Sequence, residues 1–387
     1  MRWLSFLWIS GLAFGLTIST AVAAAGCNSY SPIKVHAEGI TAESTITRLR
    51  AVSYTAPMIQ GTDKNDLQLV RHDFTAIKKA GFNAVRGYEP LTPEVLQVAE
   101  DEGLLVVQAL VHLSDDTNYD SDDELRDVIA RVRQIVIRDR CRRNIALWSL
   151  WNDAPFNWGA SGGNVVERFG ARTVRRFLRR LRDEVKKLDP LRPLTAANVL
   201  NAMHSDIGMD LLDIIGVNVY IGVFDWPSQR YSHALAKETI NRVKRISEKF
   251  KKPIWISETG ISSIPGSDQA GIVIPTQLRL IEESGIAGFA VFQWQDDHSK
   301  ARVGAQPSRD VEANWGLLNA RGTPKPSLEK IASVLLGDAR RLKPIARVTR
   351  EPWTVNGKSP FKASQSLESF KLENLDPVQT GYRLLSK

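Results

Sequence analysis

Short apolar runs alternate with longer amphipathic stretches from about residue 46 to residue 336. The apolar runs have strand length and predict strands at 48–54, 82–86, 104–111, 145–151, 194–199, 213–220, 253–258 and 286–294. The stretches between them have helical periodicity and predict helices at 66–80, 93–102, 121–138, 163–188, 233–250 and 274–284, with a last helix at 327–336. The fifth crossover, at 204–212, is short.

Strands that are joined by helical crossovers pair in parallel, and near-continuously apolar strands fit a sheet that is covered on both faces. The alternating region has a usual size for a (β/α)8 barrel. A doubly wound open sheet would show a glycine-rich phosphate loop after its first strand, and the segment TAPMIQGTD at 55–63 is not one. The sequence therefore predicts an α/β fold, a single-domain (β/α)8 TIM barrel over residues 47–337.

Polar or aromatic side chains stand where the predicted strands end. They are Arg86, His112, Asn152, Asp153, Tyr220, Glu258 and Trp294. Barrel enzymes carry their active residues at the C-terminal ends of the strands. Asp153 and Glu258 lie in aromatic surroundings, and a pair of carboxylates is what cleavage of a glycosidic bond requires. The pattern indicates a glycosidase.

The chain of 387 residues is 43% hydrophobic and 24% charged, which is ordinary for a globular protein. Its net charge is +8 and its pI about 9.4, and much of the basic charge lies in the predicted helix at 171–188. That charge is either a solvated outer face or an attraction to an anionic polymer or lipid surface. We predict no nucleic-acid partner, because no nucleic-acid motif accompanies it. Without a Cys/His cluster we expect no metal or other cofactor; the oligomeric state stays open.

The first residues, 1–26, combine an early arginine, an apolar run and small residues, which is typical of a secretory signal peptide. An uncleaved membrane anchor is the alternative. Cys27 follows Ala-Ala-Gly and resembles a bacterial lipoprotein cleavage site, at which the cysteine becomes lipidated; plain cleavage nearby fits equally well. The only other cysteine, Cys141, then has no obvious partner, and two cysteines exclude a disulfide scaffold.

We therefore expect an exported protein, which is periplasmic, membrane-anchored through Cys27 or secreted. Residues 27–46 are predicted to be a linker to the barrel. Residues 338–387 are predicted to be a tail that either packs on the barrel or is disordered.

Three segments of the predicted barrel resemble a known family. They are DFTAIKKAGFNAVRGYEPLTPEVLQVAEDEGLLVV at 73–107, RQIVIRDRCRRNIALWSLWND at 133–153 and NWGLLNARGTPKPSLEKI at 314–331. Their order and spacing are similar to clan A glycoside hydrolases, most closely to the catalytic barrel of family 2, the β-galactosidase, β-glucuronidase and β-mannosidase group. The resemblance is to the barrel without the β-sandwich domains of that family.

The resemblance implies roles for the residues at the strand ends. Glu258 would be the nucleophile, and Arg86 and Tyr220 would hold its carboxylate. Asn152 would bind the sugar 2-hydroxyl, and carbohydrate would be the substrate. The other implied or suspected sugar contacts are Trp294 as the floor of the −1 subsite, His112, Trp151 and Asp297, although Asp297 and its neighbour Asp296 could instead cap a loop.

Asp153 stands where the family has an acid/base glutamate. Aspartate is one methylene shorter, and a displacement of about 1 Å can cost roughly 100-fold in rate. Three hypotheses follow: a working acid/base in an adapted site, an inverting enzyme, or a carbohydrate-binding barrel that has lost catalysis. Inverting pairs lie about 6.5 to 9.5 Å apart and retaining pairs about 5 to 5.5 Å. Glu89 is the one substitute acid that we consider.

We predict an exported glycosidase that cleaves O-glycosidic bonds of a polysaccharide or oligosaccharide with retention. Transglycosylation is a further alternative, since aromatic acceptor subsites compete with water.

Overall fold

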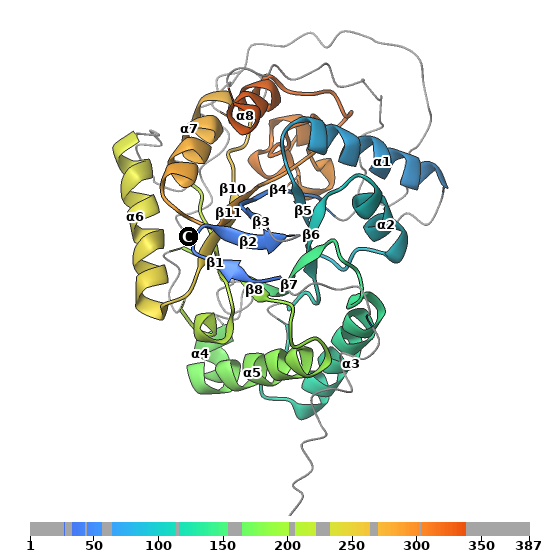
Figure 1. Ribbon diagram of the computed structural model, residues 1–387, viewed down its shortest axis with the longest axis vertical. Coiled ribbons are helices and arrows are strands. Elements are labelled where there is room, and N and C mark those ends of the chain that lie inside the picture. The colour runs from blue at the N-terminus through green and yellow to red at the C-terminus, as the bar shows by residue number, and fades with distance from the viewer. Residues whose placement is uncertain are drawn as a thin grey trace, which may run out of the picture.

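The structure is a computed structural model that describes residues 27, 33–42, 45–55, 64–113, 116–153, 165–200, 206–221, 233–263, 270–301 and 303–337. Parallel strands close into a barrel, in the order of the chain from first to last (Figure 1). The strands are β4 (Leu49–Ser53), β5 (Ala84–Arg86), β6 (Leu105–Ala109), β7 (Ile145–Asn152), β8 (Leu194–Val199), β9 (Ile215–Asn218), β10 (Ile254–Thr259) and β11 (Gly288–Val291). The predicted (β/α)8 barrel is confirmed.

Helices surround the barrel, as Figure 1 shows. They are α1 (Lys64–Lys79), α2 (Pro93–Asp101), α3 (Asp122–Asp139), α4 (Val165–Phe169), α5 (Ala171–Leu188), α6 (His233–Phe250), α7 (Ala270–Glu283) and α8 (Pro326–Leu336). Thr92 and Ser121 cap the starts of α2 and α3 by accepting backbone hydrogen bonds from the first turn. The short fifth crossover contains only a 3-10 turn, η3 (Met209–Leu211), in its described part.

The last barrel strand is shorter than the sequence predicts. It ends at Val291 rather than at residue 294. Beyond Val291 the chain keeps two backbone bonds to the neighbouring strands, from Phe292 N–H to Thr259 O at 2.8 Å and from Trp294 N–H to Ser53 O at 2.9 Å. It also pairs with a later loop: Gln293 N–H donates to Trp315 O at 3.1 Å, and Leu318 N–H donates to Trp294 O at 2.8 Å. The apolar pattern continues past the strand because Trp294 is still buried there.

The predicted linker is in fact a three-stranded antiparallel sheet, β1 (Val35–His36), β2 (Gly39–Ala42) and β3 (Thr45–Thr47). Ile33 and Ile40 are buried in one cluster with Leu49 and Ala84, which begin barrel strands. The sheet therefore closes the N-terminal end of the barrel, opposite to the end that carries active residues (Figure 1). Strands of two to four residues are too short for an alternation signal.

The cysteine prediction is wrong in one respect. Cys27 forms a disulfide with Cys141, whose Cα atom lies 5.2 Å away, within the usual range for such a bond. The sequence left Cys141 without a partner, because 114 residues separate the two cysteines and only the fold brings them together. A sulfur in a disulfide cannot also carry a lipid, so the disulfide and the predicted lipidation of Cys27 are mutually exclusive.

The basic helix α5 buries Val174, Phe177, Leu178, Leu181 and Val185 against the barrel. Several of its arginines form ion pairs on the outer face, among them Arg180 with Asp122 at 2.7 Å and Arg176 with Asp120 at 3.2 Å. The solvated outer face is thus the better account of this charge.

Within the described residues, no helix is long and apolar enough to span a membrane. The predicted signal peptide (1–26) and the predicted tail (338–387) lie outside the described residues.

Candidate active site

Glu258 lies in β10, where every residue of the strand is buried. From the part of the chain that the structure describes, its carboxylate accepts three hydrogen bonds. Arg86 Nη1 donates to Oε1 at 2.7 Å, Tyr88 OH donates to Oε1 at 2.9 Å, and Tyr220 OH donates to Oε2 at 2.6 Å. These donors suit a carboxylate that carries its negative charge inside the protein, because bonds to an ionised acceptor are the stronger kind.

Arg86 ends β5 and is 1% exposed. Burial alone would lower its pKa, but the nearby Tyr88 and Glu258 raise it above the ordinary value. Besides binding Glu258, its Nη1 donates to the Ser257 carbonyl at 2.8 Å, and its Nη2 donates to Asn152 Oδ1 at 2.5 Å. The guanidinium therefore links the end of β10 to the end of β7.

Asp153 follows β7 with a left-handed backbone, φ 53°, a conformation that aspartate adopts more readily than most residues. Asn218 Nδ2 donates to both of its carboxylate oxygens, at 3.0 and 3.2 Å, and Asn152 Nδ2 donates to Oδ2 at 3.2 Å. Burial and the charge of Glu258 raise the pKa of Asp153 to about 8, while Arg86 and the two amides oppose the shift. At neutral pH Asp153 therefore holds a proton.

The two carboxyl groups thus have different environments. Glu258 accepts hydrogen bonds from a guanidinium and two phenols. The described donors to Asp153 are neutral side-chain amides. A raised pKa assigns one acid of such a pair as the proton donor, and hydrogen bonds from a guanidinium suit the other to carry the charge. The site can therefore combine an anionic nucleophile with a protonated acid.

Aromatic rings surround the Glu258 side of the site. The rings of Tyr220, Phe292 and Trp315 are mutual neighbours, with centroids 5.2 to 6.4 Å apart, and Tyr88 packs edge-on against Phe292 at 5.8 Å. Phe292 is half-buried, so part of its ring stays accessible. Phe292 is the better candidate for an apolar contact with a sugar.

Two tryptophans that the sequence assigned to substrate binding are almost fully buried. Trp294 is 1% exposed and belongs to the main hydrophobic core, so it presents little surface as the floor of a subsite. Trp151 is also 1% exposed, and its ring lies with Leu178 of α5 beside Gly208, outside the barrel. Both rings pack in the main hydrophobic core.

The remaining polar candidates have separate positions. Asp297 is buried and caps the 3-10 turn η4 (His298–Lys300), accepting from Ser299 N–H at 3.0 Å, so it acts as a cap in this structure. Asp296 is buried against Lys325, with Nζ 2.6 Å from Oδ1, and burial raises its pKa to about 6. His112 follows β6 and is exposed, and its contact with sugar stays a prediction.

The sequence missed two residues of this site, Tyr88 and Asn218. Tyr88 stands two residues after Arg86, and Asn218 stands two residues before Tyr220. Both are hydrogen-bonding side chains at or just beyond a strand end, which is the same signal that identified their neighbours. Glu89, the substitute acid, is exposed.

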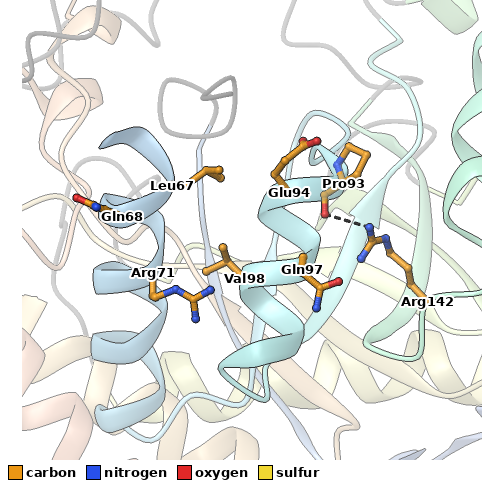
Figure 2. Close-up of a pocket in the computed structure, with 8 residues that line it drawn as sticks. All are labelled: Leu67, Gln68, Arg71, Pro93, Glu94, Gln97, Val98 and Arg142. Carbon is orange, nitrogen blue, oxygen red and sulfur yellow. Dashed lines mark hydrogen bonds between the residues drawn. The ribbon is translucent and has the colours of Figure 1, made fainter. Parts of the chain in front are cut away.

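A separate hollow of about 590 Å³ lies on the outer layer between α1 and α2 (Figure 2). Its lining includes Arg71 and Arg142, but Arg71 is bound to Asp101 and Arg142 donates to the Pro93 carbonyl at 3.0 Å. Because these cations already have partners, we assign the hollow no role. Among the described residues, no group of three or more His, Cys, Asp or Glu side chains is placed to hold a metal ion.

Comparison with known proteins gives a consistent picture. The β-glucuronidase of Paenibacillus borealis is 24% identical over 306 residues, which are 75% of this chain and 46% of that protein. Among solved structures, a family 2 β-galacturonidase from Eisenbergiella tayi bound to galacturonate superposes with a TM-score of 0.62 at 18% identity, covering 79% of this chain and 54% of that one. A β-D-glucuronidase from Dictyoglomus thermophilum gives the same TM-score and identity, covering 79% and 53%. The structural likeness shows the fold.

The chain spans about half the length of these relatives. The family model described as "Glycosyl hydrolases family 2, TIM barrel domain" matches residues 60–334, which include both Asp153 and Glu258. That match covers most of the chain and the whole set of site residues. The chain belongs to the TIM barrel domain family of the family 2 glycosyl hydrolases.

Proposed function

We propose that the protein is a glycosidase that hydrolyses O-glycosidic bonds with retention of configuration. Glu258 is the nucleophile and Asp153 the acid/base. The observation that carries the proposal is the contrast between the two carboxyl groups: Glu258 is held by Arg86, Tyr88 and Tyr220, while burial near that charge leaves Asp153 protonated at neutral pH.

The reaction has two steps. In the first, Glu258 forms a bond to the anomeric carbon, the bond to the leaving oxygen breaks, and Asp153 gives its proton to that oxygen. In the second, ionised Asp153 takes a proton from water, the water oxygen bonds to the anomeric carbon, and Glu258 leaves with the electron pair of the ester bond. Each group ends in the state in which it began.

The shorter side chain of Asp153 is the main objection to this mechanism. Two features of its surroundings answer it. The left-handed backbone changes the direction in which the side chain leaves the strand, and Asn218 and Asn152 hold its carboxyl in one place. The raised pKa of Asp153 is also what an acid catalyst requires, because such a residue must hold its proton near the working pH.

We further propose β-linked uronic acid glycosides as the first substrates to test. The relatives named above are a β-glucuronidase, a β-galacturonidase and a second β-glucuronidase. Neutral β-galactosides, β-mannosides and β-glucosides belong in the same test, because these relatives share only 18 to 24% identity with the chain.

Export is part of the proposal. The Cys27–Cys141 disulfide supports it, since such bonds persist in oxidising compartments outside the bacterial cytoplasm. The signal-like composition of residues 1–26 points the same way. We propose an exported form in which Cys27 is disulfide-bonded rather than lipidated.

A panel of 4-nitrophenyl and 2,4-dinitrophenyl β-glycosides tests the activity, with Glu258→Gln as the matched control. We expect turnover of at least one dinitrophenyl substrate by the native protein, loss of about 1,000-fold or more in the variant, and a β-configured first product by proton NMR.

Each alternative has its own outcome in the same experiment. An α-configured first product establishes inversion, and transfer of the sugar to added alcohol in preference to water establishes transglycosylation. Absence of turnover across the panel, with intact folding, refutes the proposal and favours a barrel without catalysis.

A further inference from the structure

Tyr88 contacts the carboxylate of Glu258, and neither the sequence nor the comparisons assign it a role. It lies just beyond β5, and its phenol oxygen is 2.9 Å from Glu258 Oε1. Arg86 Nη1 donates to the same Oε1, whereas Oε2 accepts from Tyr220 among the described residues. Among the described residues Oε1 therefore has two donors and Oε2 has one, and on this count Oε2 is the freer oxygen.

The position of Tyr88 is fixed from several sides. Its oxygen accepts a bond from Arg86 Nη1 at 3.0 Å and lies 3.1 Å from Ser53 Oγ. A phenol has one proton, and Tyr88 directs it to Glu258, so the Ser53 hydroxyl must be the donor in their contact. The Arg86 guanidinium also lies over the ring at 4.5 Å.

The backbone before Tyr88 is adapted to this position. A Cβ atom at Gly87 would lie 2.9 Å from the carbonyl oxygen of Glu89, closer than the backbone allows. Glycine therefore permits the tight turn that brings the phenol back over the end of β5. Burial raises the pKa of Tyr88 well above its ordinary value, so the hydroxyl remains a donor throughout the working range of pH.

We infer that Tyr88 is a catalytic residue for the second step of the proposed reaction: its phenol proton stabilises the negative charge that returns to Glu258 when the glycosyl-enzyme is hydrolysed. This inference rests on the proposed function. Oε2 forms the bond to the anomeric carbon, and Oε1 becomes the carbonyl oxygen of the ester, still bound to Arg86 and Tyr88. When water attacks, the bond between the anomeric carbon and Oε2 breaks, and its electron pair is shared by both carboxylate oxygens of Glu258.

The two steps respond differently to this donor. In the first step the carboxylate loses charge, so a hydrogen bond stabilises the starting state at least as much as the transition state. In the second step the ester is neutral and charge develops, so the same bond lowers the barrier. Removing the donor should therefore slow hydrolysis of the glycosyl-enzyme while leaving its formation equal or faster.

The test is Tyr88→Phe, measured by rapid mixing with the dinitrophenyl β-glycoside that the native protein turns over fastest. A hydrogen bond to a charged group accounts for about 10- to 100-fold in rate. We expect kcat to fall by about that factor, KM to fall in parallel because the covalent intermediate accumulates, and kcat/KM to stay within about 3-fold. A burst of one dinitrophenolate per site should become visible.

The matched control is Tyr54→Phe, which removes another buried phenol hydroxyl bound to a carboxylate, that of Asp73 in α1 at 2.9 Å. It should leave kcat and the burst unchanged. Ser53→Ala gives a second, milder test, because it keeps the phenol but removes the hydroxyl that orients it; kcat should fall with KM in the same ratio.

An unchanged kcat in Tyr88→Phe, or an equal loss in kcat and kcat/KM, overturns the inference. If Tyr88→Phe does not fold, Ser53→Ala decides by the same two criteria. Failure of the proposed function is distinguishable, since then the native protein itself gives no turnover and no burst.

Discussion

Asn218 holds both carboxylate oxygens of Asp153, at 3.0 and 3.2 Å. Its own Oδ1 accepts a bond from the Ser257 hydroxyl at 2.7 Å, so the amide cannot rotate without losing a partner. Ser257 is the neighbour of Glu258 in β10. The acid is therefore positioned from the strand that carries the nucleophile, and this contact explains how a side chain one carbon short can still be placed for catalysis.

The first prediction concerns this amide. Asn218→Ala should reduce kcat/KM for 4-nitrophenyl and less activated glycosides by roughly 10- to 100-fold, because displacement of an acid by about 1 Å has an effect of that size. Dinitrophenyl glycosides need little acid assistance and should change by less than about 3-fold. Equal losses on both substrate classes contradict a role in positioning the acid.

The second prediction concerns the length of the acid itself. Asp153→Glu should lower kcat/KM on poor leaving groups by about 10-fold or more, because Asn218 and Asn152 are set for the shorter carboxyl. Glu89→Gln, a change at an exposed carboxyl, should have no effect. A gain in activity with Asp153→Glu means that Asp153 is a defective acid, and a loss with Glu89→Gln assigns Glu89 as the acid.

The third prediction is a pH dependence. Because the pKa of Asp153 is raised to about 8, kcat/KM for poor leaving groups should fall as the pH rises through about 8, approaching 10-fold per pH unit above it. With dinitrophenyl glycosides, kcat/KM should not show this fall at high pH, because the first step then needs little acid assistance. If kcat/KM falls equally steeply with both substrate classes, the titrating group is not Asp153.

The fourth prediction follows from the same carboxyl group and concerns stability. Asp153 releases its proton at the ordinary value of 3.8 when unfolded and at about 8 when folded. Between these values the folded state holds more protons, so the free energy of unfolding falls as the pH rises through this window. Asp153→Asn removes that dependence and should raise Tm at pH 8.5 by roughly 2 °C or more.

Thermal unfolding of both forms across the pH range provides the control. The difference between Asp153→Asn and the native protein should shrink toward zero as the pH falls below about 4, where the native carboxyl is protonated in both states. A constant difference at all pH values attributes the effect to packing.

The fifth prediction concerns the Cys27–Cys141 disulfide, which fastens the chain before β1 to the segment after α3. Reduction should destabilise the protein by about 2 to 4 kcal/mol. The Cys27→Ala, Cys141→Ala double variant should match the reduced protein and be insensitive to dithiothreitol. Full stability of the double variant, or a lipid mass on Cys27 of the exported protein, contradicts the assignment.

The sequence predicted the barrel well because its signals are local. Each strand is a buried apolar run, and each helix carries an apolar stripe, so both can be recognised without knowing what they pack against. The same argument found Glu258, Arg86, Tyr220, Asn152 and Asp153, since strand order alone brings the ends of parallel strands to one face.

The sequence could not predict features that depend on the direction in which a side chain points or on contacts between residues far apart in the chain. Trp151 lies near the end of β7 and Trp294 lies just beyond β11, but a local pattern does not say whether such a ring faces the barrel mouth or the core. The Cys27–Cys141 pairing spans 114 residues and requires the fold. Asp153 and Glu258 differ in their hydrogen-bond donors because of contacts among four strands. The identity of the residues at the strand ends does not reveal these contacts.

Covalent trapping tests the central claim most directly. The native protein is incubated with the 2,4-dinitrophenyl 2-deoxy-2-fluoro β-glycoside of its best sugar, digested, and mapped by mass spectrometry. We predict one fluoroglycosyl group per chain, carried by the peptide that contains Glu258 and absent from the Glu258→Gln variant. Turnover of the parent substrate without any covalent adduct, or an adduct on another residue, contradicts the assignment of Glu258 as the nucleophile.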